Sequence, residues 1–174
     1  MSKVEYPFKG RVFSVKVERV KLPNGRVMSV EAVEHPGAVA ILPVLDDGRI
    51  ILLKQYRPTI KEWLYEIPAG TLKPGEDPDH CAIRELEEET GFTAGELVKL
   101  FSMYLAPGYS TEVIHIYLAR RLQPAEQRLE KDEVIELSMV TLDEALHMIE
   151  ENAIRDAKTI SALLYALRFS KNLP

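Results

Sequence analysis

The sequence predicts an α/β (α+β) fold, in which a mixed β-sheet carries helices on its faces and an antiparallel β-hairpin precedes it. Apolar, strand-like runs are interspersed with amphipathic helical runs, which indicates both element types in one layered domain. Several neighbouring strands are joined by short turns, so a mixed sheet fits the order of the elements better than an all-parallel one. The 174 residues are enough for one domain with a small extension.

An N-terminal extension over residues 1–36 is the first predicted unit. Arg11–Leu22 is rich in valine, a Pro-Asn-Gly turn follows, and Arg26–Glu34 is again typical of a strand. This pattern indicates a β-hairpin. His35-Pro36-Gly37 then interrupts the chain, and we place the boundary with the main domain, residues 37–174, at this point.

The main domain is predicted to alternate strands with three helices. Its expected strands are Ala38–Leu45, Arg49–Gln55, Trp63–Ile67, Leu97–Leu105, Val113–Ala119 and Val134–Val140. A helix near Leu142–Glu151 is capped by Thr141 or Asp143, and an amphipathic helix over Ala157–Phe169 ends the chain.

The clearest helix precedes Gly91, which suits the left-handed residue that ends a helix. Asp77 is a good N-cap, and Pro78 occupies the first helical position, where its missing N–H is harmless. The helix closes with the sequence Arg-Glu-Leu-Glu-Glu-Glu-Thr, and Gln, Asn and Lys are absent from this stretch.

The acidic residues of this helix are an unusual choice for stability. Glu85, Glu88 and Glu89 are three or four positions apart and therefore share one helix face. Like charges at this spacing cost about 0.2–0.5 kcal/mol per pair, and acids late in a helix oppose its dipole. Clustered carboxylates are ligands of Mg²⁺, which would remove the conflict. A solvated helix face is the alternative interpretation.

The wider segment, residues 70–92, resembles the Nudix box. That pattern is Gly, five residues, Glu, seven residues, then Arg-Glu-apolar-x-Glu-Glu-x-Gly-apolar. The matching positions are Gly70, Glu76, Arg84, Glu85, Leu86, Glu88, Glu89, Gly91 and Phe92. The phenylalanine is bulkier than the usual aliphatic residue, a minor departure. The resemblance implies an α/β/α sandwich and Mg²⁺-dependent hydrolysis of a nucleoside diphosphate derivative, with Mn²⁺ as the alternative metal.

The resemblance also implies roles for the acids. Glu85 and Glu89 would hold Mg²⁺, and Glu88, counted among the catalytic residues, would share or bridge the metal. Gly70 would let the backbone turn sharply out of a strand, which leaves the carbonyl of Ala69 exposed as a metal ligand.

The remaining box residues are expected to have structural tasks. Arg84 would orient a glutamate such as Glu76 rather than contact the substrate. Glu76 itself has two interpretations, a metal ligand or a loop acid that supports the start of the helix. Gly91 would end the helix.

The segments beside the box resemble the ADP-ribose pyrophosphatase branch of the family. They are Gln55-Tyr56-Arg57-Pro58, Tyr65–Gly70 and the Pro107 loop, Ala106–Glu112. This resemblance implies conversion of ADP-ribose to AMP and ribose 5-phosphate. The alternatives are hydrolysis of another nucleoside diphosphate derivative, such as a nucleotide sugar or a dinucleoside polyphosphate, and a non-catalytic module that binds a nucleotide.

Substrate-binding residues follow from the same resemblance. Arg57 would contact a phosphate, for which a guanidinium fork is suited, or would form only a surface salt bridge. Glu66 would help to position substrate or close a subunit contact. Glu112 and the backbone of Gly108 would face the terminal ribose. Adenine could stack on Trp63, Tyr65 or Tyr109, although aromatic residues at strand edges are more often core.

The general base is expected in the segment Leu129–Glu133, where this branch has a glutamate thought to activate water. Glu133 is the first candidate and Glu130 the second. The alternative is a solvated acidic loop, and geometry decides between them because a base must reach the water. The branch is usually a homodimer, so the N-terminal hairpin is expected to pack across a subunit boundary.

Composition restricts the remaining functions. A net charge of −5 argues against nucleic acid as the main partner. The longest apolar stretch is far shorter than a membrane span, and the N-terminus does not resemble a secretory signal. The single cysteine, Cys81, indicates a reducing compartment, so we expect a cytoplasmic protein. The four histidines show no zinc-ligand spacing.

Overall fold

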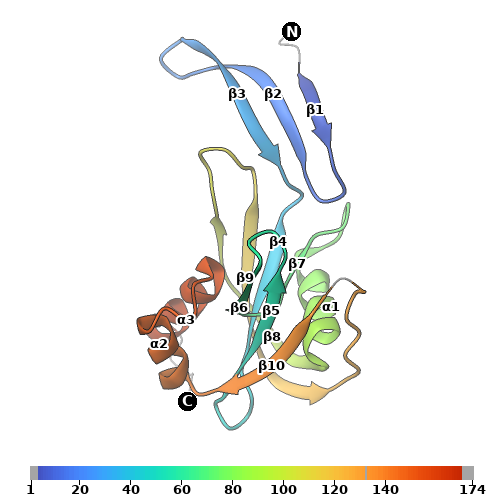
Figure 1. Ribbon diagram of the computed structural model, residues 1–174, viewed down its shortest axis with the longest axis vertical. Coiled ribbons are helices and arrows are strands. Elements are labelled where there is room, and N and C mark those ends of the chain that lie inside the picture. The colour runs from blue at the N-terminus through green and yellow to red at the C-terminus, as the bar shows by residue number, and fades with distance from the viewer. Residues whose placement is uncertain (1–3, 132, 170–174) are drawn as a thin grey trace.

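The computed structural model describes residues 4–131 and 133–169. Its strands are β1 (Glu5–Lys9), β2 (Ser14–Lys21), β3 (Val27–Glu34), β4 (Ala38–Pro43), β5 (Ile50–Arg57), β6 (Glu62–Glu66), β7 (Ala69–Thr71), β8 (Phe92–Tyr104), β9 (Val113–Pro124) and β10 (Ile135–Val140). Its helices are α1 (Pro78–Thr90), α2 (Leu142–Glu150) and α3 (Ala157–Phe169), as labelled in Figure 1. No helix within this part of the chain is long and apolar enough to cross a bilayer.

The described strands form three sheets. One sheet is mixed, in the order β7-β4-β9-β8, with β4 and β9 parallel and the other pairs antiparallel. A second sheet has the order β10-β5-β6, and the N-terminal strands form a third, β1-β2-β3. Helix α1 lies on one side of the central strands and α2 with α3 on the other (Figure 1). The prediction of a mixed α/β sandwich is therefore confirmed.

Strand β4 is buried along its whole length because it is covered on both faces. Val39 and Ile41 pack in the cluster that contains Leu86 of α1. Alternate residues such as Leu42 pack in the opposite cluster, which contains Leu163 of α3. This two-sided core holds α1 against the central sheet, and α1 carries the acidic residues.

Strand pairing differs from the order along the chain. The expected turn between β4 and β5 is present, with Gly48 at φ 86° and its amide bonded to the Leu45 carbonyl. The two strands nevertheless enter different sheets, because β4 is apolar on both faces and occupies the interior of the mixed sheet. An isolated bridge, Val44–Ile50, joins them.

The N-terminal sheet extends from one end of the molecule (Figure 1). The predicted hairpin is present as β2 and β3, and β1 adds a strand that the sequence did not suggest. No described residue of these strands is fully buried, and Phe8 and Val27 are about half exposed. The sheet contacts the β8–β9 loop through backbone bonds between Val33 and both Tyr109 and Thr111.

Candidate active site

Helix α1 has the ends that its sequence predicts. The Asp77 side chain accepts a hydrogen bond from the amide of Asp79 at 2.8 Å, and Pro78 begins the helix. Gly91 adopts φ 72°, and its amide donates to the Glu87 carbonyl at 2.9 Å. Since Leu86 is fully buried against the sheet, the rotation of the helix about its axis is fixed, and so are the directions of its glutamates.

Two of these glutamates lie against strand β7. The amide of Ala69 donates to Glu89 Oε2 at 2.8 Å. Gly70 lies directly beneath Glu85, because a Cβ added to Gly70 would be 1.9 Å from Glu85 Cδ. The glycine is thus required for close approach rather than for the sharp turn that we expected, since Ala69–Thr71 is a short strand paired with β4. The contact from Ala69 is made by its amide, and the ligand role of its carbonyl stays a prediction.

Arg84 connects the other acids of the motif. Its Nε and Nη2 donate to the two carboxylate oxygens of Glu76 at 2.9 and 3.0 Å. Its Nη1 donates to Glu85 at 2.6 Å and to Glu88 at 3.0 Å. The Arg84 guanidinium lowers the pKa of Glu76 to about 2. Glu76 also accepts from the Lys73 amide at 2.9 Å, so it is bound to the loop that precedes α1.

Negative charge nevertheless remains in excess around Glu85 and Glu89. Burial, followed by the charges of Glu85 and Glu133, raises the pKa of Glu89, which is 2% exposed. Burial also raises the pKa of Glu85 despite its contact with Arg84. Buried carboxylates with raised pKa values are groups that a hard divalent cation would stabilise.

The geometry is compatible with such a cation. Among the described residues no three His, Cys, Asp or Glu side chains are gathered at metal-ligand spacing. The predicted set, however, consists of two side chains, Glu85 and Glu89, and the backbone carbonyl of Ala69. Both side chains lie over β7, where Gly70 leaves room for them, so the residues present fit the metal.

Arg57 and Glu66 form a bidentate ion pair across the hairpin of β5 and β6. Arg57 Nε and Nη2 each donate to one oxygen of Glu66 at 2.7 Å. Glu66 is 1% exposed, and Lys158 of α3 donates to its Oε2 as well. The carboxylate therefore has no open surface for a substrate in this structure. Arg57 does form a salt bridge, but its partner Glu66 is buried rather than at the surface as we considered, and the Arg57 side chain itself is 39% exposed.

The loop after β9 is hydrogen-bonded to the end of α1. The side chain of Gln127 donates to the Glu89 carbonyl at 2.7 Å, and the amide of Arg128 donates to the Glu88 carbonyl at 2.9 Å. Arg128 also contacts the side chain of Glu87. The segment that carries the candidate bases is thus hydrogen-bonded to the end of the acidic helix α1.

The two candidate bases of this loop differ in position. Glu133 Oε2 accepts from the amide of Glu130 at 2.8 Å. Burial is the main cause of the raised pKa values of Glu85 and Glu89, and the negative charge of Glu133 contributes to both. Glu133 therefore lies near the acidic cluster. Glu130 is exposed. Of the two candidates for the general base, Glu133 is therefore the one that lies closer to the acidic cluster.

The Pro107 loop lies at the base of the N-terminal sheet. Glu112 Oε1 is 3.8 Å from His35 Nδ1, and Gly108 has open space around its Cα. No contact in the described part of the chain joins either residue to the acidic cluster. Their role at the terminal ribose stays a prediction.

The three aromatic candidates for adenine are dispersed. Tyr65 packs against the core between the sheet and α3, and Tyr109 is 64% exposed in the Pro107 loop. Trp63 contacts Tyr56 edge-on, with ring centroids 5.7 Å apart. Tyr65 therefore has a structural task, and the structure does not bring the three together.

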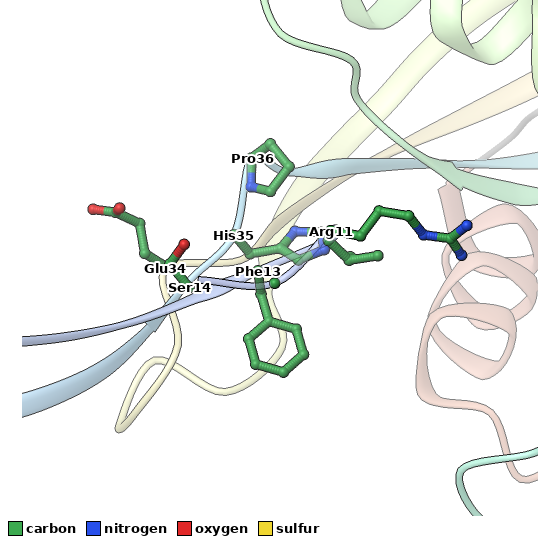
Figure 2. A pocket seen from close by; sticks show the side chains of 8 residues that line it. Arg11, Phe13, Ser14, Glu34, His35 and Pro36 are labelled. Carbon is green, nitrogen blue, oxygen red and sulfur yellow. The ribbon is translucent and has the colours of Figure 1, made fainter. Parts of the chain in front are cut away.

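A pocket of about 320 Å³ lies where the N-terminal sheet joins the main domain. Its lining residues are Gly10, Arg11, Val12, Phe13, Ser14, Glu34, His35 and Pro36, most of which are labelled in Figure 2. None belongs to the acidic cluster, so this pocket is not where the metal-dependent chemistry is expected.

Sequence reasoning missed three residues that contact the site. Lys158 lies on α3, far along the chain from Glu66, and Gln127 and Arg128 lie in a loop without a motif. A signal existed for Lys158, because a cation in the first turn of a helix opposes the helix dipole. The loop residues carry no local signal.

The thiol of Cys81 is part of the packing rather than of the chemistry. Cys81 is fully buried, and burial raises its pKa to about 12. An Arg84 nitrogen lies 3.3 Å from its sulfur. Such a thiol stays protonated and unreactive at neutral pH.

Comparison with known proteins identifies the class that this fold and acidic helix define. A family model described as the NUDIX domain matches residues 34–163. The chain belongs to the Nudix hydrolase family, whose members act on nucleoside diphosphate derivatives and generally need a divalent metal.

Individual relatives narrow the comparison. An ADP-ribose pyrophosphatase of Bacillus subtilis (strain 168) is 46% identical over 163 residues, which cover 92% of this chain and 88% of the relative. A methanol dehydrogenase activator of Bacillus methanolicus is 44% identical over 165 residues, 94% of this chain and 89% of the relative. A crystal structure of an ADP compounds hydrolase superposes with a TM-score of 0.83 and 28% identity, covering 97% of this chain and 92% of that one.

Proposed function

We propose that this Nudix hydrolase cleaves the pyrophosphate bond of ADP-ribose, giving AMP and ribose 5-phosphate, with Mg²⁺ as its metal and Mn²⁺ as the alternative. The observation that carries the proposal is the similarity to an ADP-ribose pyrophosphatase along almost the whole chain. The complete set of box acids and the phosphate-binding candidate Arg57 support catalysis rather than nucleotide binding alone.

In this proposal Glu85, Glu89 and the Ala69 carbonyl would hold the metal, and Glu88 would share it. When bound, Mg²⁺ would polarise phosphoryl oxygens and acidify a water. Arg84 keeps Glu85, Glu88 and Glu76 in place through the contacts described above.

The chain's own groups would bind substrate and move one proton. Arg57 presents the outer edge of its guanidinium to a phosphate, and Gly108 with Glu112 faces the terminal ribose. Glu133 accepts the proton of the attacking water as general base. The water oxygen forms a bond to phosphorus while the bridging P–O bond breaks, which releases the two monophosphates.

The direct test is product analysis with purified protein, ADP-ribose and Mg²⁺. Glu89→Gln is expected to reduce turnover by orders of magnitude, since an amide still accepts from the Ala69 amide but cannot supply the charge for a metal. Glu136→Gln, which changes an exposed carboxylate of β10, is the matched control with unchanged turnover. Unaltered activity in Glu89→Gln would refute the metal site. Cleavage of a nucleotide sugar or dinucleoside polyphosphate without AMP from ADP-ribose would refute the substrate.

We also propose that the chain is a homodimer in which the N-terminal sheet packs across the subunit boundary. Support comes from the exposed apolar side chains of that sheet, among them Tyr6, Phe8, Val27 and Met28. A monomer rarely exposes so many large apolar groups on one small sheet. A cytoplasmic location belongs to the same proposal, supported by the single unpaired cysteine.

A further inference from the structure

We infer that Lys158 is a positioning residue for Arg57 and acts through the buried carboxylate of Glu66. The inference rests on the proposed function in one respect, that Arg57 contacts a phosphate of the substrate. The first turn of α3 would then affect substrate binding, although α3 contributes no residue of the Nudix box.

Glu66 is the centre of the arrangement. Its two oxygens receive Nε and Nη2 of Arg57 in a fork, which fixes the plane of the guanidinium. Nη1 lies at the opposite edge of that plane, and the Arg57 side chain is 39% exposed. The orientation of the edge available to a phosphate is therefore set by the orientation of the Glu66 carboxylate.

Glu66 needs a second cation because it is almost completely buried. An ionised carboxylate in such a position is costly unless it is paired and fully hydrogen-bonded. Lys158, itself 7% exposed, donates to Glu66 Oε2, the oxygen that also accepts from Arg57 Nη2, and so supplies that second charge. Burial acts to raise the pKa of Glu66, but Arg57 and Lys158 together hold this pKa below its ordinary value.

Lys158 is in turn held by Asp156, the residue just before α3. Asp156 Oδ2 lies 3.0 Å from Lys158 Nζ and also accepts from the amide and hydroxyl of Thr159. The Thr159 hydroxyl accepts from the amide of Ile67 at 2.9 Å, one residue after Glu66. The first turn of α3 is therefore bound to the end of β6 at two adjacent points, one neutral and one charged.

These contacts make the position of a substrate-facing arginine depend on a lysine 101 residues later in the chain. Without the Lys158 ammonium, Glu66 would lose a charge-assisted bond on one oxygen only, and its carboxylate would rotate with Arg57 attached. The N–H groups at the free edge of the guanidinium would then no longer point at the phosphate oxygens. Substrate binding, rather than the proton transfer at Glu133, is the step that should suffer.

The test compares steady-state kinetics of full-length variants. Lys158→Met keeps the aliphatic stem and removes the charge, and it is expected to raise KM for ADP-ribose about tenfold, with kcat changed much less. Lys158→Arg restores a cation and should recover most of the loss. Arg155→Met is the matched control, because it breaks an exposed ion pair with Glu62 that joins the same two segments. It should leave KM unchanged.

A double variant tests whether Lys158 acts through Arg57. In an Arg57→Ala background, Lys158→Met should raise KM no further, since the group that it positions is gone. An unchanged KM in Lys158→Met, or a full additional effect in the Arg57→Ala background, would overturn the inference. Equal losses in Arg155→Met would do so too, because they would indicate a general tethering of α3.

Two controls separate an effect on substrate binding from loss of the fold and from a wrong substrate. Melting temperatures of all variants separate loss of fold from loss of binding, and Lys158→Gln, which retains a donor without the charge, replaces a methionine variant that does not fold. The wild-type product assay tests the proposed function independently. If wild-type protein cleaves another diphosphate instead of ADP-ribose, the same KM comparison is made with that substrate.

Discussion

At the scale of single residues, Gly70 shows how the site constrains a position that has no side chain. Its neighbour Glu85 occupies the space that any Cβ would need, and the carboxyl group is held there by Arg84. A larger residue at position 70 therefore has to move the carboxylate, the backbone of β7 or both.

Gly70→Ala is accordingly expected to disable the proposed metal site. The added methyl group should displace Glu85, so Mg²⁺-dependent hydrolysis should fall by orders of magnitude, and overpacking should lower the free energy of unfolding by about 1–3 kcal/mol. Activity and chemical denaturation check the two effects. Gly108→Ala is the control for stability, because nothing lies within 4 Å of its added Cβ. A Gly70→Ala variant with normal metal affinity would contradict the steric argument.

At the scale of elements, α1 both presents the acids and holds the loop that carries the candidate base. Gln127 bonds to the Glu89 carbonyl, and the Arg128 amide bonds to the Glu88 carbonyl, so the loop uses carbonyls that the helix leaves without partners at its end. The loop and the acidic end of α1, which carries the proposed metal ligands, are therefore parts of one hydrogen-bonded unit.

Removing the Gln127 side chain should loosen this unit. Gln127→Ala is expected to lower kcat several-fold with little change in KM, because Glu133 would be correctly placed for a smaller fraction of the time. Steady-state kinetics with ADP-ribose measure the split. Glu126→Ala, an exposed neighbour in the same loop, should have no effect on either constant. A change confined to KM in Gln127→Ala would indicate a substrate contact instead.

Helix caps were predictable from the sequence, whereas strand partners were not. The caps of α1 were predicted correctly, and Thr141 is the one of the two caps considered for α2 that is present, because capping depends on residues within one turn. Strand partners were not predictable, since β4 leaves the adjacent β5 to pair with the distant β9, a choice made by burial on both faces. The same limit explains β1, whose side chains are all exposed and leave no buried pattern.

In the candidate site, too, local features were predictable from the sequence and contacts between distant segments were not. The acids of α1 lie on one helix and were predictable from spacing, whereas the Glu66–Lys158 pair joins segments 92 residues apart. The role of Gly70 was misjudged for the same reason, because the conflict with Glu85 arises only when β7 and α1 are packed together.

At the scale of the whole molecule, the buried acids link metal binding to pH. Burial and the neighbouring carboxylates raise the pKa of Glu89 in the folded, metal-free chain. Between the ordinary pKa of glutamate and this raised value, the folded state binds more protons than the unfolded state. The free energy of unfolding of the metal-free protein should therefore decrease as pH rises through this window.

The proposed metal, Mg²⁺, should reverse the trend, because a divalent cation would bind the carboxylates in their ionised form. Its addition is expected to raise the melting temperature more at about pH 8 than at about pH 5.5. Differential scanning calorimetry with Mg²⁺ or with a chelator measures the difference. In Glu89→Gln the rise in melting temperature on adding Mg²⁺ should depend less on pH. In the wild-type protein, an equal rise at both pH values would argue against Glu89 as a ligand.

The proposed dimer gives a separate prediction for the assembly. Phe8→Asp places a charge on the exposed apolar surface of the N-terminal sheet, where Phe8 is 49% exposed and lies beside Phe13. We expect sedimentation to show a shift from dimer to monomer. Asn24→Asp adds the same charge at the hairpin turn while keeping the oxygen that accepts from Arg26, and it should remain dimeric. A monomeric wild-type protein would refute the proposed assembly.

The burial of Cys81 has a practical consequence for following the loop in solution. The sequence contains one cysteine, and its thiol is enclosed and protonated at neutral pH. A cysteine introduced at Glu126 would be the only thiol open to maleimide reagents, so a fluorophore or spin label could be attached there without a cysteine-free background. Such a probe would report when the segment carrying Glu133 moves relative to α1 during turnover.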